Sequence, residues 1–193
     1  MKMKREIIEF RDAELTADSG NDTGQWVGGV AARFNVPYIL YTDDAGLTYS
    51  EQLDAGCCDG VDLSTTVMRY NHDDSYPVLA RTSNNTMQIS IDTNQIYVKA
   101  DIAPTSAGKD IYALIKRGDI SGQSIGMVVA DDYLDRATRT RHITKITKFV
   151  DISAVDRPAY GDSTSLEALK RSLEAADQER ADVRKRIYIM TML

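Results

Sequence analysis

A series of short β-forming runs, separated by turn formers, constrains the fold of this chain more than any other feature. The runs are rich in Val, Ile, Tyr and Thr, and no regular βαβ rhythm connects them. The sequence therefore predicts a mostly β chain of the α+β class with flanking helices, built as a barrel or a sandwich rather than a doubly wound sheet. The expected strands are Arg5–Phe10, Trp26–Phe34, Val67–Tyr70, Thr86–Ile91, Ile96–Ile102, Ile125–Ala130 and Arg141–Val155.

Helical spacing replaces the strand pattern after Ile102. Thr105 or Ser106 can cap a helix whose apolar residues share one face, and Lys116-Arg117-Gly118 is a typical helix end. One or two helical turns are also expected around Tyr49–Ala55. The polar segment 131–140 is expected to be a hairpin loop.

The last part of the chain differs in kind from the rest. A narrow apolar stripe with three-four spacing runs from Leu166 to Ile187, and Thr164 with Glu167 forms a candidate capping box. We expect a main domain over residues 1–162 and an amphipathic C-terminal helix within 163–193. The stripe needs a partner surface, and both its own domain and a second protein remain open as that surface.

Charge and hydropathy exclude two classes of ligand. The net charge is −6 and the basic residues are dispersed, so nucleic acid is disfavoured as a partner. No apolar run is long enough to span a membrane, and the apolar run after the positive N-terminus is too short for a signal peptide. We therefore expect neither nucleic acid nor membrane among the partners.

The two cysteines, Cys57 and Cys58, are adjacent in the sequence. Neighbouring cysteines pair only through a strained ring, and two thiols make an incomplete zinc site. Buried, reduced thiols in a reducing cytoplasm are the favoured interpretation. A cysteine hydrolase that uses one of them is a less favoured alternative.

A serine between two glycines is the first candidate for chemistry. Residues 122–126 read Gly-Gln-Ser-Ile-Gly, which matches the nucleophile elbow G-x-S-x-G and centres on Ser124. That elbow needs a strand before it and a helix after it, whereas here a helix precedes and a strand follows. The α/β-hydrolase fold is therefore rejected, while Ser124 stays a candidate nucleophile, with Ser121 as its competitor.

A serine nucleophile needs a base, and the chain has only two histidines. His72 follows the expected strand Val67–Tyr70, a rigid place from which to aim an imidazole, whereas His142 lies in a charged strand. A metal site at His72-Asp73-Asp74 is weak because no further ligand stands at suitable spacing. Asp151 interrupts an apolar strand and is the candidate carboxylate that orients the imidazole.

Four stretches in order resemble the phage prohead (capsid maturation) serine protease family, whose fold is related to the herpesvirus assemblins. The resemblance covers roughly residues 5–163. The stretches are Gly29-Val-Ala-Ala-Arg-Phe-Asn35, Asn71-His-Asp73 with Leu79-Ala-Arg81, Gly118-Asp-Ile-Ser-Gly-Gln-Ser-Ile-Gly126, and Asp151-Ile-Ser-Ala-Val155 with Pro158-Ala159.

The resemblance implies a role for each candidate residue. Ser124 falls on the nucleophile and His72 on the base, while Ser121 and His142 do not fall on functional positions. Asp151 stands where most members carry Glu, so its contact with His72 must be made by a shorter side chain. Arg157 replaces the small residue that the resemblance leads us to expect before Pro158-Ala159, and it is a candidate to polarise the oxyanion, as an arginine does in assemblins. The implied fold is a small closed β-barrel with flanking helices, and no metal or organic cofactor is implied.

The function implied by the resemblance is that of a serine endopeptidase inside an assembling prohead in the host cytoplasm. Its protein substrates would be the scaffold, the scaffolding segment of the major capsid protein, and the protease itself. A homodimer or larger oligomer is expected by analogy with assemblins. The alternative is a non-catalytic capsid assembly or scaffold protein that uses the same fold.

Overall fold

The computed structural model describes residues 5–9, 15–17, 24–43 and 45–156 of the chain. Within these residues the chain forms eleven strands, one α-helix and one short 3₁₀ turn. The strands are β1 (Arg5–Glu9), β2 (Thr16–Ala17), β3 (Trp26–Arg33), β4 (Tyr38–Thr42), β5 (Thr48–Leu53), β6 (Val67–Tyr70), β7 (Ala80–Arg81), β8 (Met87–Ile91), β9 (Gln95–Asp101), β10 (Gly122–Asp135) and β11 (Thr140–Val155). The helix α1 spans Ser106–Arg117, and the turn η1 spans Thr82–Asn84.

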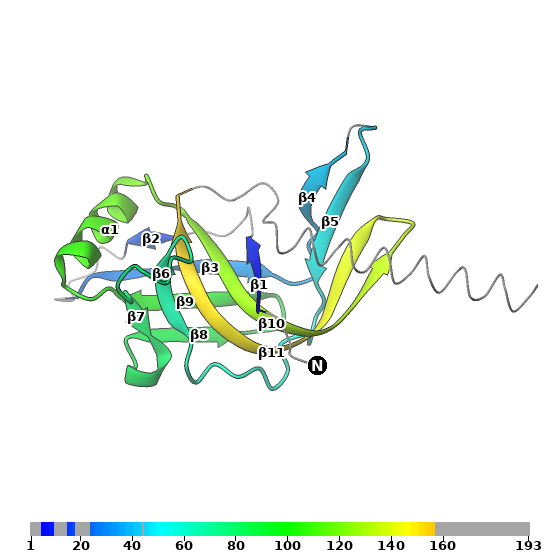
Figure 1. The fold of residues 1–193 in the computed structure, drawn as a ribbon. Helices are drawn as coiled ribbons and strands as arrows, with labels where there is room; N and C mark the ends of the chain where they lie inside the picture. Colours follow the sequence, from blue (N-terminus) through cyan, green and yellow to red (C-terminus); the bar gives the residue numbers. More distant parts are fainter. Residues whose placement is uncertain (1–4, 10–14, 18–23, 44, 157–193) are drawn as a thin grey trace, which may run out of the picture.

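The strands form two sheets that pack against each other (Figure 1). The larger sheet has the order β1-β10-β11-β5-β4, and β6 pairs in parallel with β11 and carries β7 on its other side. The smaller sheet has the order β2-β3-β9-β8. The predicted mostly β fold with a helix over 106–117 is confirmed. Strands β8 and β9 pair as an antiparallel hairpin.

The prediction of a closed barrel is wrong, because neither sheet closes on itself within the described residues. The larger sheet ends at β1 and β4, its β6–β7 branch ends at β7, and the smaller sheet ends at β2 and β8. The physical reason lies in the length of β10 and β11, which continue beyond the core as a pair, and there β11 pairs with β5 instead of curling back. Their distal ends and the β4–β5 hairpin therefore extend away from the two packed sheets (Figure 1).

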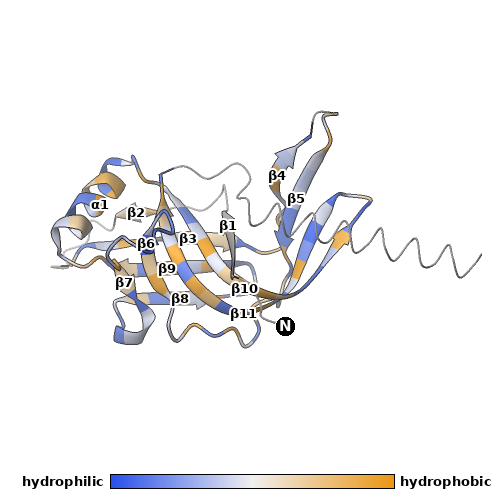
Figure 2. Cartoon of the chain, viewed as in Figure 1, coloured by the Kyte–Doolittle hydropathy of each residue, from blue (hydrophilic) through white to orange (hydrophobic). Residues whose placement is uncertain are grey.

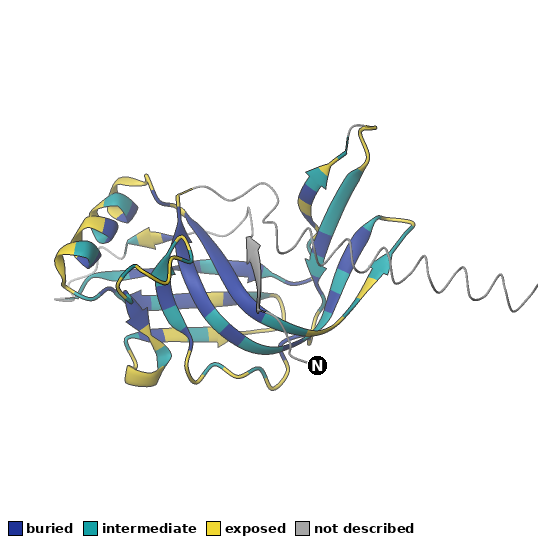
Figure 3. Ribbon diagram, in the orientation of Figure 1, coloured by how far each residue is buried: buried dark blue, intermediate teal, exposed yellow. Residues whose placement is uncertain are grey.

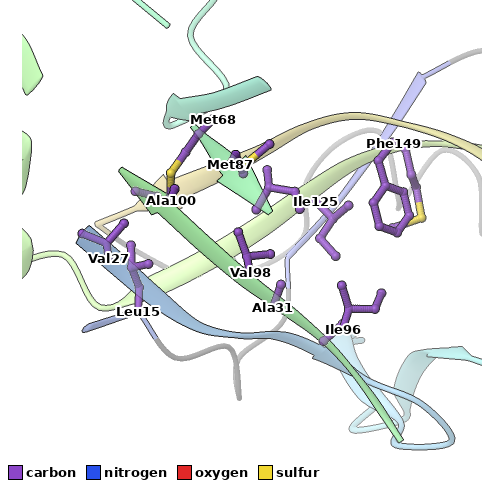
Figure 4. Packing of buried hydrophobic residues seen from close by; sticks show 14 of the residues in the cluster. Leu15, Val27, Ala31, Met68, Met87, Ile96, Val98, Ala100, Ile125 and Phe149 are labelled. Atoms are coloured by element: carbon purple, nitrogen blue, oxygen red, sulfur yellow. The ribbon is translucent and has the colours of Figure 1, made fainter. Parts of the chain in front are cut away.

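The core lies between the sheets and is apolar on both sides (Figure 4). Strand β9 shows why: its buried residues Ile96, Val98 and Ala100 alternate with more exposed ones, as one buried face of a strand requires. From the other sheet, Ile125 and Phe149 pack toward them. Figure 2 shows that hydrophobic and hydrophilic residues are interspersed along the strands.

A β-bulge in β11 changes which face its residues occupy. Phe149 pairs with Met127 and Asp151 pairs with Gly126, so Val150 is the extra residue. In a regular strand, Phe149 and Asp151 would point to the same face. The bulge lets Phe149 enter the core while Asp151 turns to the opposite face. The half of the β10–β11 ribbon that lies over the core is the buried part (Figure 3).

Two local predictions are wrong for a shared reason. The segment expected to be helical around residue 49 is strand β5, and the expected loop over 131–140 is mostly the paired ends of β10 and β11. Polar contacts replace apolar burial there. The buried Arg141 forms ion pairs with Glu51 at 2.6 Å and Asp132 at 2.5 Å, which join β5 to the ribbon.

The predicted C-terminal helix, its capping box and Arg157 lie outside the described residues. The boundary at residue 162 therefore stays a prediction. In the described part of the chain, no helix is both long and apolar enough to cross a membrane.

Candidate active site

Ser124 lies within strand β10, which begins at Gly122, three residues before the expected strand Ile125–Ala130. It pairs with Glu9 of β1 on one side and with Ser153 of β11 on the other. Because neighbouring Ile125 faces the core, Ser124 points to the opposite face of the sheet, which is the face that Asp151 also occupies. A strand held on both sides fixes the position of the Ser124 hydroxyl.

His72 is carried by a tight turn that follows β6. Both Asn71 and His72 have left-handed backbone conformations, with φ of 48° and 55°. Non-glycine residues adopt this region rarely, and Asn and His are among those that tolerate it best. Two such residues in a row direct the imidazole back over β11 toward β10. The expectation that His72 stands at a strand end is confirmed within two residues.

Contacts on both sides hold this strained turn in place. The Asn71 backbone N–H donates to the Ala154 carbonyl at 3.0 Å, and the Asn71 side-chain amide donates to Asp156 at 3.3 Å. Tyr70 donates its hydroxyl to the same carboxylate at 3.1 Å, and burial together with this bond raises the pKa of Tyr70. Arg69 donates to the Asp73 and Tyr76 carbonyls at the far side of the turn.

Asp151 meets His72 despite its short side chain. Its Oδ2 lies 2.5 Å from His72 Nδ1, and its side chain is 1% exposed. The parallel pairing of β6 with β11 brings the turn after β6 directly over this part of β11. The path of the backbone therefore brings the short Asp151 side chain within hydrogen-bonding distance of His72.

The three side chains form one hydrogen-bonded chain across β10, β11 and the turn. His72 Nε2 lies 2.7 Å from Ser124 Oγ, while Nδ1 faces Asp151. A carboxylate at Nδ1 favours the tautomer that carries its proton there, which leaves Nε2 as an acceptor for the serine proton. The arrangement is able to convert the Ser124 hydroxyl into a nucleophile.

The competing candidates lie elsewhere. His142 sits on the distal part of β11, where its Nδ1 contacts Asp54 at 2.8 Å and its ring stacks on Tyr133. Ser121 is exposed immediately before β10, and its backbone carbonyl accepts from the Leu15 N–H. In the described part of the protein, neither side chain forms a hydrogen bond with Ser124, His72 or Asp151.

One polar residue beside Asp151 was not predicted from the sequence to belong to the site. Ser153 is fully buried and donates its hydroxyl to Asp151 Oδ2 at 2.8 Å. The only sequence signal was its place two residues after Asp151, which puts both side chains on one face of a strand. Among the described residues, no three His, Cys, Asp or Glu side chains are placed to hold a metal ion.

The two cysteines are buried and reduced, as expected, with their sulfur atoms 3.7 Å apart. Neither contacts Ser124, His72 or Asp151 in the recorded bonds. The hydrogen bond with Cys57 and burial both raise the pKa of the Cys58 thiol, which keeps it protonated. Since the thiolate is the reactive form, this cysteine is a poor nucleophile.

Iodoacetamide is therefore expected to leave the folded protein unmodified at pH 8. The same reagent should add two carbamidomethyl groups once urea exposes the two thiols. Intact mass spectrometry measures both states. Rapid alkylation of the folded protein with parallel loss of activity would instead support a cysteine hydrolase.

A serine, an imidazole and a carboxylate linked in this order form the arrangement that serine hydrolases use. The comparisons with known proteins agree with this class. The chain belongs to the Caudovirus prohead serine proteases, because the model of that family matches residues 11–179. A search of curated proteins found no match.

Among solved structures, the chain is similar to the bacteriophage T4 capsid assembly protease, gp21. The TM-score is 0.52 and the sequence identity is 14%, over 79% of this chain and 97% of that one. At this identity the likeness shows a shared fold. It is the fold of a phage capsid protease, mostly β with one helix in the part described here.

Proposed function

We propose that this chain is the maturation protease of a phage prohead, with Ser124 as nucleophile, His72 as general base and Asp151 as the group that orients His72. The observation that carries the proposal is the continuous hydrogen-bonded chain from Ser124 Oγ to His72 Nε2 at 2.7 Å and from Nδ1 to Asp151 at 2.5 Å. Membership of the prohead serine protease family supports the same assignment.

The chemistry follows from the two ends of the imidazole. Ser124 Oγ attacks the peptide carbonyl carbon while its proton moves to His72 Nε2, and the carbonyl electron pair moves onto oxygen. The tetrahedral intermediate collapses, the C–N bond breaks, and Nε2 returns the proton to the leaving amine. A water molecule then repeats the sequence on the acyl-enzyme. Asp151 stabilises the imidazolium in both halves of the reaction.

The oxyanion needs a hydrogen-bond donor, a contribution of about 3 kcal/mol per donor. Backbone N–H groups near Ser124 or in the loop that carries Arg157 are the donors we propose. Arg157 stays a candidate donor on the strength of the resemblance alone.

Ser124 is fully buried, and the His72 side chain is 8% exposed. A peptide carbonyl must therefore displace what covers the Ser124 hydroxyl before it is attacked. Such a closed site suits an enzyme that cleaves only inside an assembling prohead. The substrates we propose are the scaffold, the scaffolding segment of the major capsid protein, and the protease itself.

Co-expression with the major capsid protein and scaffold of the same phage tests this function. Intact masses followed over time should show trimming with the wild-type chain and with Ser121→Ala, and none with Ser124→Ala. Ser121 is a matched control because it is an exposed serine three residues away. Intact chains in assembled shells would instead identify a non-catalytic assembly protein. Equal cutting by wild type and Ser124→Ala would show that the activity belongs to another protein.

A further inference from the structure

Ser153 lies beside the proposed catalytic residues. It lies on β11 directly opposite Ser124 on β10, and on the same face of β11 as Asp151. Its side chain is fully buried. A buried hydroxyl is costly unless it is hydrogen-bonded, so its partners indicate what it stabilises.

The Ser153 hydroxyl contacts both Asp151 and His72. It donates to Asp151 Oδ2 at 2.8 Å and accepts from the His72 backbone N–H at 3.2 Å. Its oxygen also lies 3.2 Å from His72 Nδ1. One oxygen atom therefore joins the carboxylate, the imidazole edge and the backbone of the turn that carries the imidazole.

The contacts of Ser153 hold two parts of the site in place: the Asp151 carboxylate and the backbone of His72. Asp151 Oδ2 is the same oxygen that faces His72 Nδ1, so the bond from Ser153 holds the carboxylate in the rotamer that meets the imidazole. The backbone of His72 is in the left-handed region with φ of 55°, which needs support from its surroundings. The bond from its N–H to Ser153 supplies such support.

We propose that Ser153 is a positioning residue that acts on peptide cleavage through Asp151 and His72. This inference rests on the proposed function of the site. Ser153 is not an alternative nucleophile, because it meets His72 at Nδ1, which carries a proton in the tautomer that Asp151 favours. Only Nε2 accepts a proton, and Nε2 faces Ser124.

Steady-state cleavage of a fluorogenic peptide, taken from a site mapped in the co-expression experiment, tests the proposal. Ser153→Ala is expected to lower kcat roughly 10-fold to 100-fold with little change in KM, because small misplacements of catalytic groups cost rates of this order. Ser121→Ala serves as the matched control and should keep the wild-type rate. A Ser153→Ala variant within about 2-fold of wild type would overturn the proposal.

A double-mutant cycle separates positioning from a general loss of stability. In an Asp151→Ala background, adding Ser153→Ala is expected to slow cleavage by less than about 2-fold, because the group it positions is gone. The same fold loss in both backgrounds would show that Ser153 acts independently of Asp151 and would overturn the proposal. Thermal unfolding of each variant shows whether all are folded at the assay temperature.

Failure of the proposed function gives a different pattern. In that case the wild-type chain would not cleave the peptide, or Ser124→Ala would cleave it at the wild-type rate. The Ser153 proposal alone fails when Ser124→Ala is inactive and Ser153→Ala is not slowed.

Discussion

Alanine at Ser124 or at His72 is expected to lower kcat for peptide cleavage by about 10⁴-fold to 10⁶-fold. Without Oγ there is no group to attack the carbonyl. In the proposed mechanism, His72 Nε2 lies 2.7 Å from Ser124 Oγ and accepts its proton. Without Nε2 the proton of this weakly acidic hydroxyl has no acceptor.

The double variant Ser124→Ala/His72→Ala gives a sharper result. It is expected to be no slower than either single variant, because residues that act as one unit lose their whole effect when either is removed. Single-turnover cleavage of the mapped peptide measures all three rates. Losses that multiply in the double variant would contradict the proposal that these residues form one site.

Asp151→Asn is expected to lower kcat by about 10³-fold to 10⁴-fold while the protein stays folded. The amide keeps the volume of the carboxylate but removes the charge 2.5 Å from Nδ1, so the imidazolium loses its stabilising partner and the favoured tautomer changes. Asp62→Asn is the matched control, because Asp62 carries an equivalent charge at an exposed position. It should keep the wild-type rate.

Asp151→Glu distinguishes placement from charge. Asp151 Oδ2 already lies 2.5 Å from His72 Nδ1, so another methylene must displace the carboxylate or the imidazole. We expect a loss of roughly 10-fold to 100-fold, smaller than that of Asp151→Asn, because the charge is kept and the imidazole is displaced. A glutamate variant as fast as wild type would show that the turn carrying His72 adjusts freely.

The strands of the core could be predicted because apolar alternation reports burial. In β9 the alternation of Ile96, Val98 and Ala100 matched the observed faces. It failed in β5 and in the distal ribbon, where buried Arg141 and Glu51 satisfy each other and give no apolar signal. The closed barrel was expected from a family resemblance, and strand pairing beyond the core is not visible in local sequence.

The residues of the proposed site were predicted from the sequence, whereas the construction of the site was not. Ser124, His72 and Asp151 were candidates from the sequence, and the structure brings their side chains within hydrogen-bonding distance of one another. Their geometry depends on the bulge at Val150 and on two left-handed residues in the turn, which set the directions of Asp151 and His72. Bulges and αL pairs arise from pairing between distant segments, so sequence patterns did not reveal them.

Labelling with a fluorophosphonate probe tests the central claim most directly, because the probe phosphonylates only an activated serine. The probe is added to proheads that contain the wild-type chain and are actively trimming their capsid protein. Tandem mass spectrometry is expected to place a single adduct on Ser124, and His72→Ala should abolish it. An adduct on Ser121 or Ser153, or none in a preparation that is cleaving substrate, would contradict Ser124 as the nucleophile.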